Sequence, residues 1–113
     1  MAQAVRGETW DESAPIDTLA DGLAVRVPIQ GMVDEIKPLI DDVWLVEEPD
    51  LLPAVKSLLE LEQVVTEPSA AIPIAGLVAF RKQTAGRRVA AILTGAHLSP
   101  ELMALSLCAD GLL

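Results

Sequence analysis

Two side chains of this 113-residue chain have the types that most often carry nucleophilic or metal chemistry, and each occurs once. They are His97 and Cys108, eleven residues apart. A catalytic triad or a Cys–His pair cannot be assigned from them, because each role needs further partners at defined positions. A metal site would likewise need more ligands at suitable spacing. We therefore interpret His97 as a surface residue and Cys108 as a small core residue.

The oxygen-bearing side chains stand at the ends of apolar runs. Thr94 and Gly95 directly follow the run 89–93, and Glu67 precedes Pro68 at the start of a further apolar stretch. Taken by themselves, Thr94 is interpreted as a turn residue and Glu67 as a charge at a helix N-terminus, where the helix dipole favours it. The acidic pairs at 41–42 and 47–48 are interpreted as solvated strand ends, although a cation or small ligand could bind there.

The composition is aliphatic for so small a chain. Hydrophobic residues make up 51% of it, the mean hydropathy is +0.41, and aromatic residues make up 3%. Such a composition suits strands that are buried on both faces of a parallel sheet. It also indicates that part of the apolar surface is covered by something outside the chain, such as a missing domain or a second copy.

The charge argues against two classes of partner. The formal net charge is −9, which disfavours binding to nucleic acid or to anionic membranes. No apolar stretch approaches the roughly 18 residues of a membrane span, and the first ten residues lack the apolar run of a signal peptide. With one cysteine, an intrachain disulfide is impossible. We therefore expect a cytoplasmic protein.

Hydrophobic periodicity predicts an alternation of strands and helices. Residues 1–15 are predicted to be the end of a helix followed by a loop. The predicted strands are 23–27, 43–46 and 89–93, and the predicted helices are 32–40, 50–65, 69–82 and a last one that begins at Ser99-Pro100. This order predicts a single α/β domain over 1–113, a three-layer fragment in which a short, mainly parallel sheet is flanked by helices.

Three motifs then occur in a characteristic order. They are Thr18-Leu19-Ala20-Asp21-Gly22-Leu23, then Asp41-Asp42-Val43 with Glu67-Pro68-Ser69-Ala70 after the next helix, and finally the run 89–93 ending in Thr94-Gly95. Together they resemble the C-terminal region of the fold-type-II pyridoxal-phosphate (PLP) enzymes, the threonine dehydratase and serine racemase family. The resemblance covers residues 16–101 and implies that the chain is part of the large domain of such an enzyme.

The resemblance implies roles for four residues. Thr94 occupies the position of the hydroxyl that meets the pyridine nitrogen of the cofactor in the family, and Gly95 that of a glycine which lets backbone approach the ring. Gly22 matches a loop close to the cofactor, and Glu67 matches a glutamate at the edge of the site. The implied reaction is elimination of water from serine or threonine with release of ammonia, or racemisation by related carbanion chemistry.

The chain also departs from the family pattern. His97 stands where the family has an asparagine, no Gly-rich phosphate loop is found, and Lys37, Lys56 and Lys82 all lie in predicted amphipathic helices. We therefore expect a truncated or split gene product that binds no PLP and has no dehydratase activity alone. Two alternatives remain open: a non-enzymatic module that forms a homo-oligomer, or one half of a split enzyme completed by an N-terminal chain.

Overall fold

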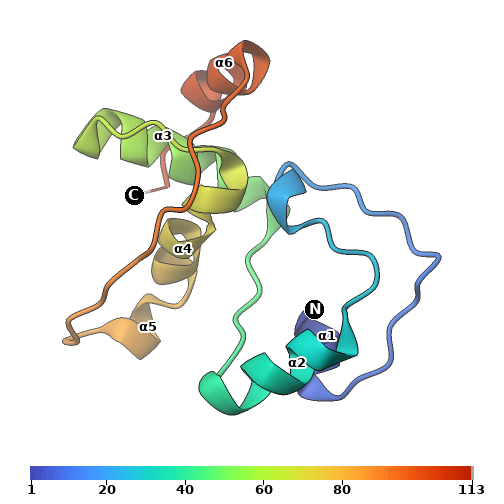
Figure 1. The fold of residues 1–113 in the computed structure, drawn as a ribbon. Coiled ribbons are helices and arrows are strands. Elements are labelled where there is room, and N and C mark those ends of the chain that lie inside the picture. The colour runs from blue at the N-terminus through green and yellow to red at the C-terminus, as the bar shows by residue number, and fades with distance from the viewer. Residues whose placement is uncertain (113) are drawn as a thin grey trace.

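The computed structural model describes residues 1–112, and these residues form helices joined by extended segments (Figure 1). Among them no residue belongs to a β-strand. The elements in chain order are α1 (Ala2–Arg6), η1 (Asp21–Leu23), α2 (Gln30–Ile36), η2 (Lys37–Leu39), η3 (Glu48–Asp50), α3 (Leu51–Glu62), α4 (Pro68–Ala79), α5 (Arg81–Thr84) and α6 (Pro100–Cys108), where η marks a 3₁₀ turn.

The predicted three-layer α/β architecture with a mainly parallel sheet is therefore wrong for this chain. Residues 43–46 and 89–93 do run as extended chain, but no ladder of backbone hydrogen bonds joins them to each other or to any other described segment. The third predicted strand, 23–27, begins in the turn η1 instead. A helix satisfies its backbone groups within itself, whereas a strand needs a neighbour.

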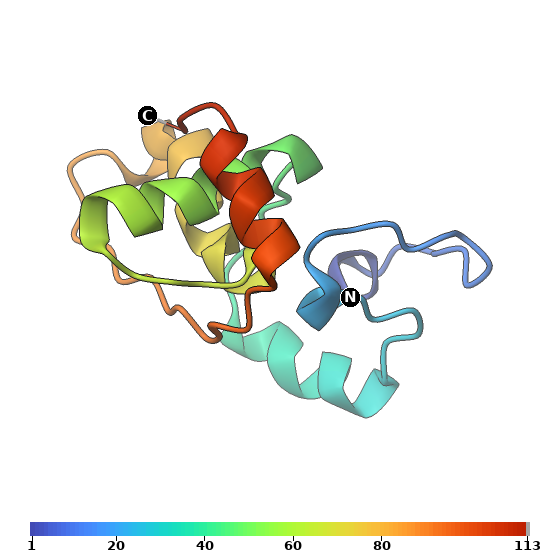
Figure 2. The same ribbon diagram turned by 90° about the horizontal axis from the view of Figure 1, so that it is seen from above.

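Three helices pack together in the C-terminal part of the molecule. Figure 2 shows α3, α4 and α6 as one group, with α1 and α2 to one side. The core between α3 and α4 contains side chains that are almost fully buried, namely Ala54, Val55, Leu58, Ala71 and Ala75. Alanines at the contact let the two helix backbones approach closely, so that this small core is tightly packed.

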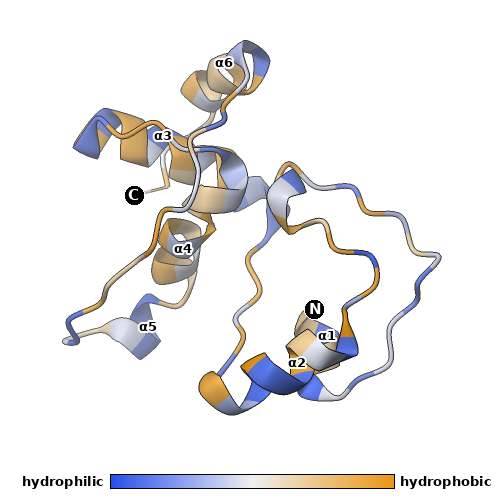
Figure 3. Ribbon diagram, in the orientation of Figure 1, coloured by the Kyte–Doolittle hydropathy of each residue, from blue (hydrophilic) through white to orange (hydrophobic). Residues whose placement is uncertain are grey.

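A second, smaller apolar cluster joins the N-terminal helices. Ala4 and Val5 of α1 pack with Val33 of α2, and Trp10 and Val43 lie against them. Apolar side chains also continue onto the extended segments, as the orange stretches in Figure 3 show, and many of these are exposed. Ile92, for example, keeps 76% of its surface exposed.

The helix predictions were largely confirmed. The predicted helix 50–65 corresponds to α3, and α6 begins with Ser99 as its N-cap, whose hydroxyl accepts a hydrogen bond from the Leu102 amide. The predicted helix 69–82 is broken at Phe80 into α4 and α5, and Phe80 stacks on Trp44. Pro38 lies in η2, where the helical path continues as a 3₁₀ turn.

Candidate functional site

The candidate site is centred on the side chain of Glu67, at the beginning of α4. Glu67 is the N-cap residue, and its carbonyl oxygen accepts hydrogen bonds from the amides of Ala70 and Ala71. Pro68 follows at the first helical position, where its missing N–H costs nothing. The Glu67 amide donates to the carbonyl oxygen of Gly95 at 3.3 Å, which brings the residues after 89–93 beside the start of α4.

The Glu67 carboxylate is held by two donors on different segments. One oxygen, Oε1, accepts from the Ser69 hydroxyl at 2.6 Å, and the other, Oε2, accepts from the His97 amide at 3.1 Å. The Ser69 bond, then the His97 bond, lower the pKa of Glu67 below its ordinary value by stabilising the charged form. The carboxylate is therefore ionised near neutral pH and fastens the 95–97 turn to α4.

Two glycines let the backbone approach this carboxylate. A Cβ atom added to Gly95 would lie 2.6 Å from Cδ of Glu67 and 2.8 Å from its Oε1. A Cβ atom added to Gly22 would lie 2.9 Å from the Ser69 hydroxyl and 3.4 Å from Glu67 Oε1. A side chain at Gly95 would force the Glu67 carboxylate out of its present position, and one at Gly22 would press on the Ser69 hydroxyl. We call Gly22, Glu67, Ser69, Gly95 and His97 the Glu67 cluster.

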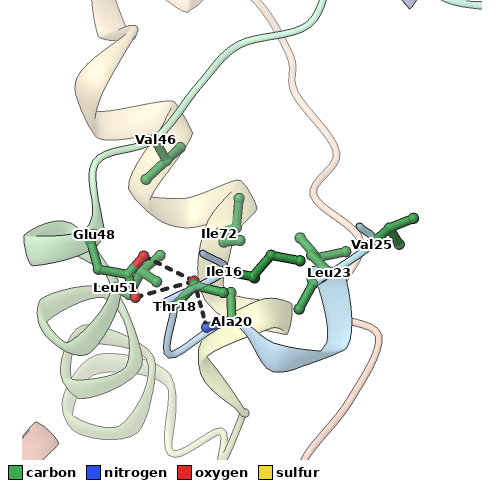
Figure 4. A pocket seen from close by; sticks show the side chains of 10 residues that line it. Ile16, Thr18, Ala20, Leu23, Val25, Val46, Glu48, Leu51 and Ile72 are labelled. Carbon is green, nitrogen blue, oxygen red and sulfur yellow. Dashed lines mark hydrogen bonds between the residues drawn. The ribbon is translucent and has the colours of Figure 1, made fainter. Parts of the chain in front are cut away.

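The loop that leads into η1, the turn that carries Gly22, is fixed by a second carboxylate, that of Glu48. Figure 4 shows the Thr18 hydroxyl and the Glu48 side chain pointing toward one another among the residues that line a small pocket. The Thr18 hydroxyl donates to Glu48 at 2.9 Å, and the Leu19 amide also donates to it. Glu48 begins η3, the 3₁₀ turn that leads directly into α3, so these bonds tie the loop to the start of that helix. The pocket has a volume of about 220 Å³, and most of the residues that line it are apolar.

Thr94 lies at a shallow depression on the other side of Gly95. The depression has a volume of about 300 Å³ and is lined by Val64, Val65, Thr66, Leu93, Thr94, Gly95 and Ala96. Thr94 is exposed, and its hydroxyl makes no hydrogen bond within residues 1–112. The Thr66 hydroxyl is buried and likewise has no partner among the described residues. Of these two residues, Thr94 is exposed, whereas the Thr66 hydroxyl is shut off from solvent.

None of the three lysines lines this depression. The Lys56 ammonium donates to the carbonyl oxygen of Ala109 at 2.7 Å, so it fastens the end of α6 to α3. Lys37 lies in η2 and Lys82 in α5. Cys108, predicted to be a core residue, is exposed.

The described part of the chain was also searched for a metal site and for a membrane-spanning helix. Over residues 1–112, no group of three or more His, Cys, Asp or Glu side chains is arranged to hold a metal ion. The same residues contain no helix that is long and apolar enough to cross a membrane.

The four residues singled out from the sequence lie near one another in space. Gly22, Glu67 and Gly95 are in direct proximity, and Thr94 adjoins Gly95. The contribution of Ser69 was missed, although its position two residues after Glu67 at a helix start could have indicated it. His97 contributes its backbone amide to the cluster, which no side-chain pattern could predict.

The sequence comparisons identify the class of protein. Residues 1–95 match the family of pyridoxal-phosphate dependent enzymes, and the chain belongs to that family. The predicted resemblance is therefore confirmed.

The similar proteins include an L-threonine ammonia-lyase and L-threonine dehydratases. The chain is 35% identical over 81 residues to L-threonine ammonia-lyase of Geobacter sulfurreducens, which is 72% of this chain and 20% of that protein. It is 37% identical over 96 residues to the biosynthetic L-threonine dehydratase of Haemophilus influenzae, which is 83% of this chain and 18% of that protein. It is 28% identical over 101 residues to the catabolic L-threonine dehydratase of Staphylococcus aureus strain N315, which is 87% of this chain and 29% of that protein. The chain thus spans less than a third of each relative's length.

The depression suits one edge of PLP and not the whole cofactor. A hydroxyl such as that of Thr94 can form a hydrogen bond with a ring nitrogen without protonating it. The lining holds no cationic side chain that could bind the phosphate group. The Glu67 carboxylate occupies the place that a side chain at Gly95 would take, so in this structure the missing side chain makes room for Glu67.

Proposed function

We propose that this chain forms the ring-nitrogen edge of the cofactor site in a PLP-dependent serine/threonine dehydratase, an ammonia-lyase, and that it has no such activity alone. The main support is the position of Thr94. This residue is exposed, its hydroxyl makes no hydrogen bond within residues 1–112, and it lies beside a turn that the Glu67 carboxylate holds in place. PLP, when bound, supplies the electron sink for the elimination of water and release of ammonia.

Within such a site the chain's own residues would position and tune the cofactor. A neutral hydroxyl at Thr94 accepts or donates one hydrogen bond at the ring nitrogen, and unlike a carboxylate it does not hold a proton there. The Glu67 carboxylate keeps the 95–97 turn fixed, so that Thr94 is presented from a rigid support. Gly22, the middle residue of η1, closes the same cluster.

The proposed inactivity of the isolated chain is supported by the residues that surround Thr94. No lysine lines its depression, so no amine is placed to bond covalently with the cofactor aldehyde, and no cation is placed for its phosphate. A complementing N-terminal polypeptide that carries both would restore the site. This is the split-enzyme role, and the threonine-specific names of the relatives favour L-threonine as the first substrate to test.

The first test is an absorbance titration of the pure chain with PLP, followed by borohydride reduction and peptide mass spectrometry. We expect no saturable cofactor band and no single modified lysine. A saturable band trapped on one of the three lysines would overturn the proposed inactivity of the isolated chain.

The second test supplies the missing part. The chain is co-expressed with the N-terminal part of the Geobacter enzyme, ending where its similarity to this chain begins, and the complex is assayed for PLP binding and ammonia release from L-threonine. Thr94→Val removes the hydroxyl at nearly constant shape, and we expect PLP binding at least tenfold weaker. The control is Thr9→Val, at an exposed threonine outside the site. Equal behaviour of the two variants would refute the role of Thr94.

A further inference from the structure

The Thr18 hydroxyl uses both its donor and its acceptor capacity. It donates to the Glu48 carboxylate, at 2.9 Å from Oε2 and 3.2 Å from Oε1, and it accepts from the Ala20 amide at 3.0 Å. A hydroxyl has one hydrogen, so the bond to Glu48 fixes the direction in which the lone pairs of the Thr18 oxygen point. Glu48 therefore orients the group that holds the Ala20 amide.

The backbone that Glu48 holds leads directly into η1. Ala20 is the N-cap residue of this turn and is buried, and its carbonyl oxygen accepts from the Leu23 amide at 2.9 Å. That bond closes the turn around Gly22. The Leu19 amide also donates to Glu48. Two successive backbone amides are thus bound to one carboxylate, the first directly and the second through a hydroxyl, so Glu48 fixes the entry to η1.

The middle of η1 meets the Glu67 cluster. The turn contacts α4, and a Cβ atom added to Gly22 would lie 2.9 Å from Oγ of Ser69 and 3.3 Å from its Cβ. The Ser69 hydroxyl in turn donates to Oε1 of Glu67 at 2.6 Å. The backbone at Gly22 thus packs on the side chain that binds Glu67, and a displacement of η1 would free that side chain to rotate.

The two attachments of η1 stand on helices that are packed against each other. Glu48 begins η3, which leads directly into α3, and Ser69 lies in the first turn of α4. These two helices share the buried core that includes Val55 and Ala71. η1 is therefore held at two places against one packed pair of helices. Groups joined in one such network affect one another energetically when either is changed.

We propose that Glu48 is a positioning residue for the Glu67 cluster, acting through the Thr18 hydroxyl and η1. The bonds that Glu48 accepts hold η1 against Ser69, and Ser69 keeps the Glu67 carboxylate in place. Hydrogen bonds to an ionised carboxylate are roughly twice as strong as those between neutral groups, which suits an anchor. The benefit to a bound cofactor rests on the proposed function, whereas the coupling between Glu48 and Glu67 is a property of the chain alone.

The test follows the Glu67 carboxyl carbon by NMR while the isotope-labelled chain is titrated with acid in the absence of PLP. The signal is assigned by its absence from Glu67→Gln. The Ser69 hydroxyl, and then the His97 amide, lower the pKa of Glu67 in the folded chain. Thr18→Val removes a hydroxyl without changing any charge, and it should raise the pKa of Glu67 toward its ordinary value. Thr18→Ser restores the hydroxyl and should restore the pKa of the wild type.

Two controls show whether the effect passes through η1 and Ser69. Thr84→Val removes another hydroxyl that makes one hydrogen bond, to the carbonyl oxygen of Arg81 at 3.3 Å in α5, and it should leave the pKa of Glu67 unchanged. In a Ser69→Ala background the link to Glu67 is absent, so Thr18→Val should no longer shift this pKa. Circular dichroism over the same pH range verifies that the variants keep their helices.

Glu48→Ala is compared in the wild-type and Thr18→Val backgrounds, because the loss of its charge is common to both and cancels. It should raise the pKa of Glu67 more in the wild type, where Thr18 can pass the change on. An unchanged pKa of Glu67 in Thr18→Val, an equal shift in the Ser69→Ala background, or equal effects of Glu48→Ala in both backgrounds would each overturn the proposal. Equal PLP binding by Thr94→Val and its control would refute the proposed function alone, since these titrations contain no PLP.

Discussion

The contact between Gly95 and Glu67 gives the sharpest prediction about the candidate site. In Gly95→Ala the new methyl group would lie 2.6 Å from Cδ of Glu67, well inside van der Waals contact. Either the 95–97 turn moves or the carboxylate is displaced from Ser69 and His97. Because the group that must move is the end of a flexible side chain, the cost is that of weakening its hydrogen bonds, about 1 kcal/mol, and we expect that loss in the free energy of unfolding.

A double-mutant cycle identifies the source of the loss. In a Glu67→Ala background the carboxylate is absent, so Gly95→Ala should cost less than about 0.5 kcal/mol, the usual range for a surface substitution. Urea unfolding followed by circular dichroism at the helix band measures all four proteins. The control is Gly31→Ala in α2, where an added Cβ meets nothing within 4 Å.

The result that would refute this reasoning is a Gly95→Ala loss of the same size in both backgrounds. The methyl group would then be clashing with something other than Glu67, and the cluster would not be held together as described. A loss confined to the wild-type background, with Gly31→Ala at least as stable as the wild type, would establish the contact in solution.

Three further predictions concern stability. Thr66→Val removes a buried hydroxyl that has no partner among the described residues, and should raise the free energy of unfolding by about 1 kcal/mol in urea; a decrease would mean that the hydroxyl is satisfied in solution. Leu58→Ala in the α3–α4 core should lower it by about 2–5 kcal/mol, while Leu61→Ala, at a residue 59% exposed, should change it by less than about 0.5 kcal/mol. Hydrogen bonding lowers the pKa of Glu67 in the folded chain. The stability that the Glu67 carboxylate adds is therefore fully present above its ordinary pKa of 4.5 and is lost as pH falls through its lower pKa in the folded chain. The difference in urea midpoint between wild type and Glu67→Gln should therefore shrink below pH 4.5, and a difference that grows there would contradict the assignment.

The sequence predicted helices well because their causes are local. The apolar face of residues 50–65 and the Ser99-Pro100 start each define an element within a few residues. The strands were mispredicted for the opposite reason. The runs 43–46 and 89–93 have the composition of buried strands, but a strand exists only where another strand bonds to it. No described residue of the chain supplies that bonding.

The candidate site could be predicted only through the family resemblance. Nothing in the spacing of Gly22, Glu67 and Gly95 shows that they meet, since 28 residues separate Glu67 from Gly95 and 45 separate it from Gly22. The hydrogen bonds of Ser69 and the His97 amide complete the cluster, and the latter involves no side chain of its own residue. Backbone donors leave little trace in residue type.

The pairing of α3 with α4 has a consequence for the order of folding. These helices are neighbours in sequence, joined by residues 63–67, so their contacts close a short loop and can form within microseconds. The extended segments have no local contact to capture them and remain open after the helices have docked. The newly made chain would therefore pass through a state with a helical core and uncovered apolar edges, in which encounter with the right partner competes with aggregation.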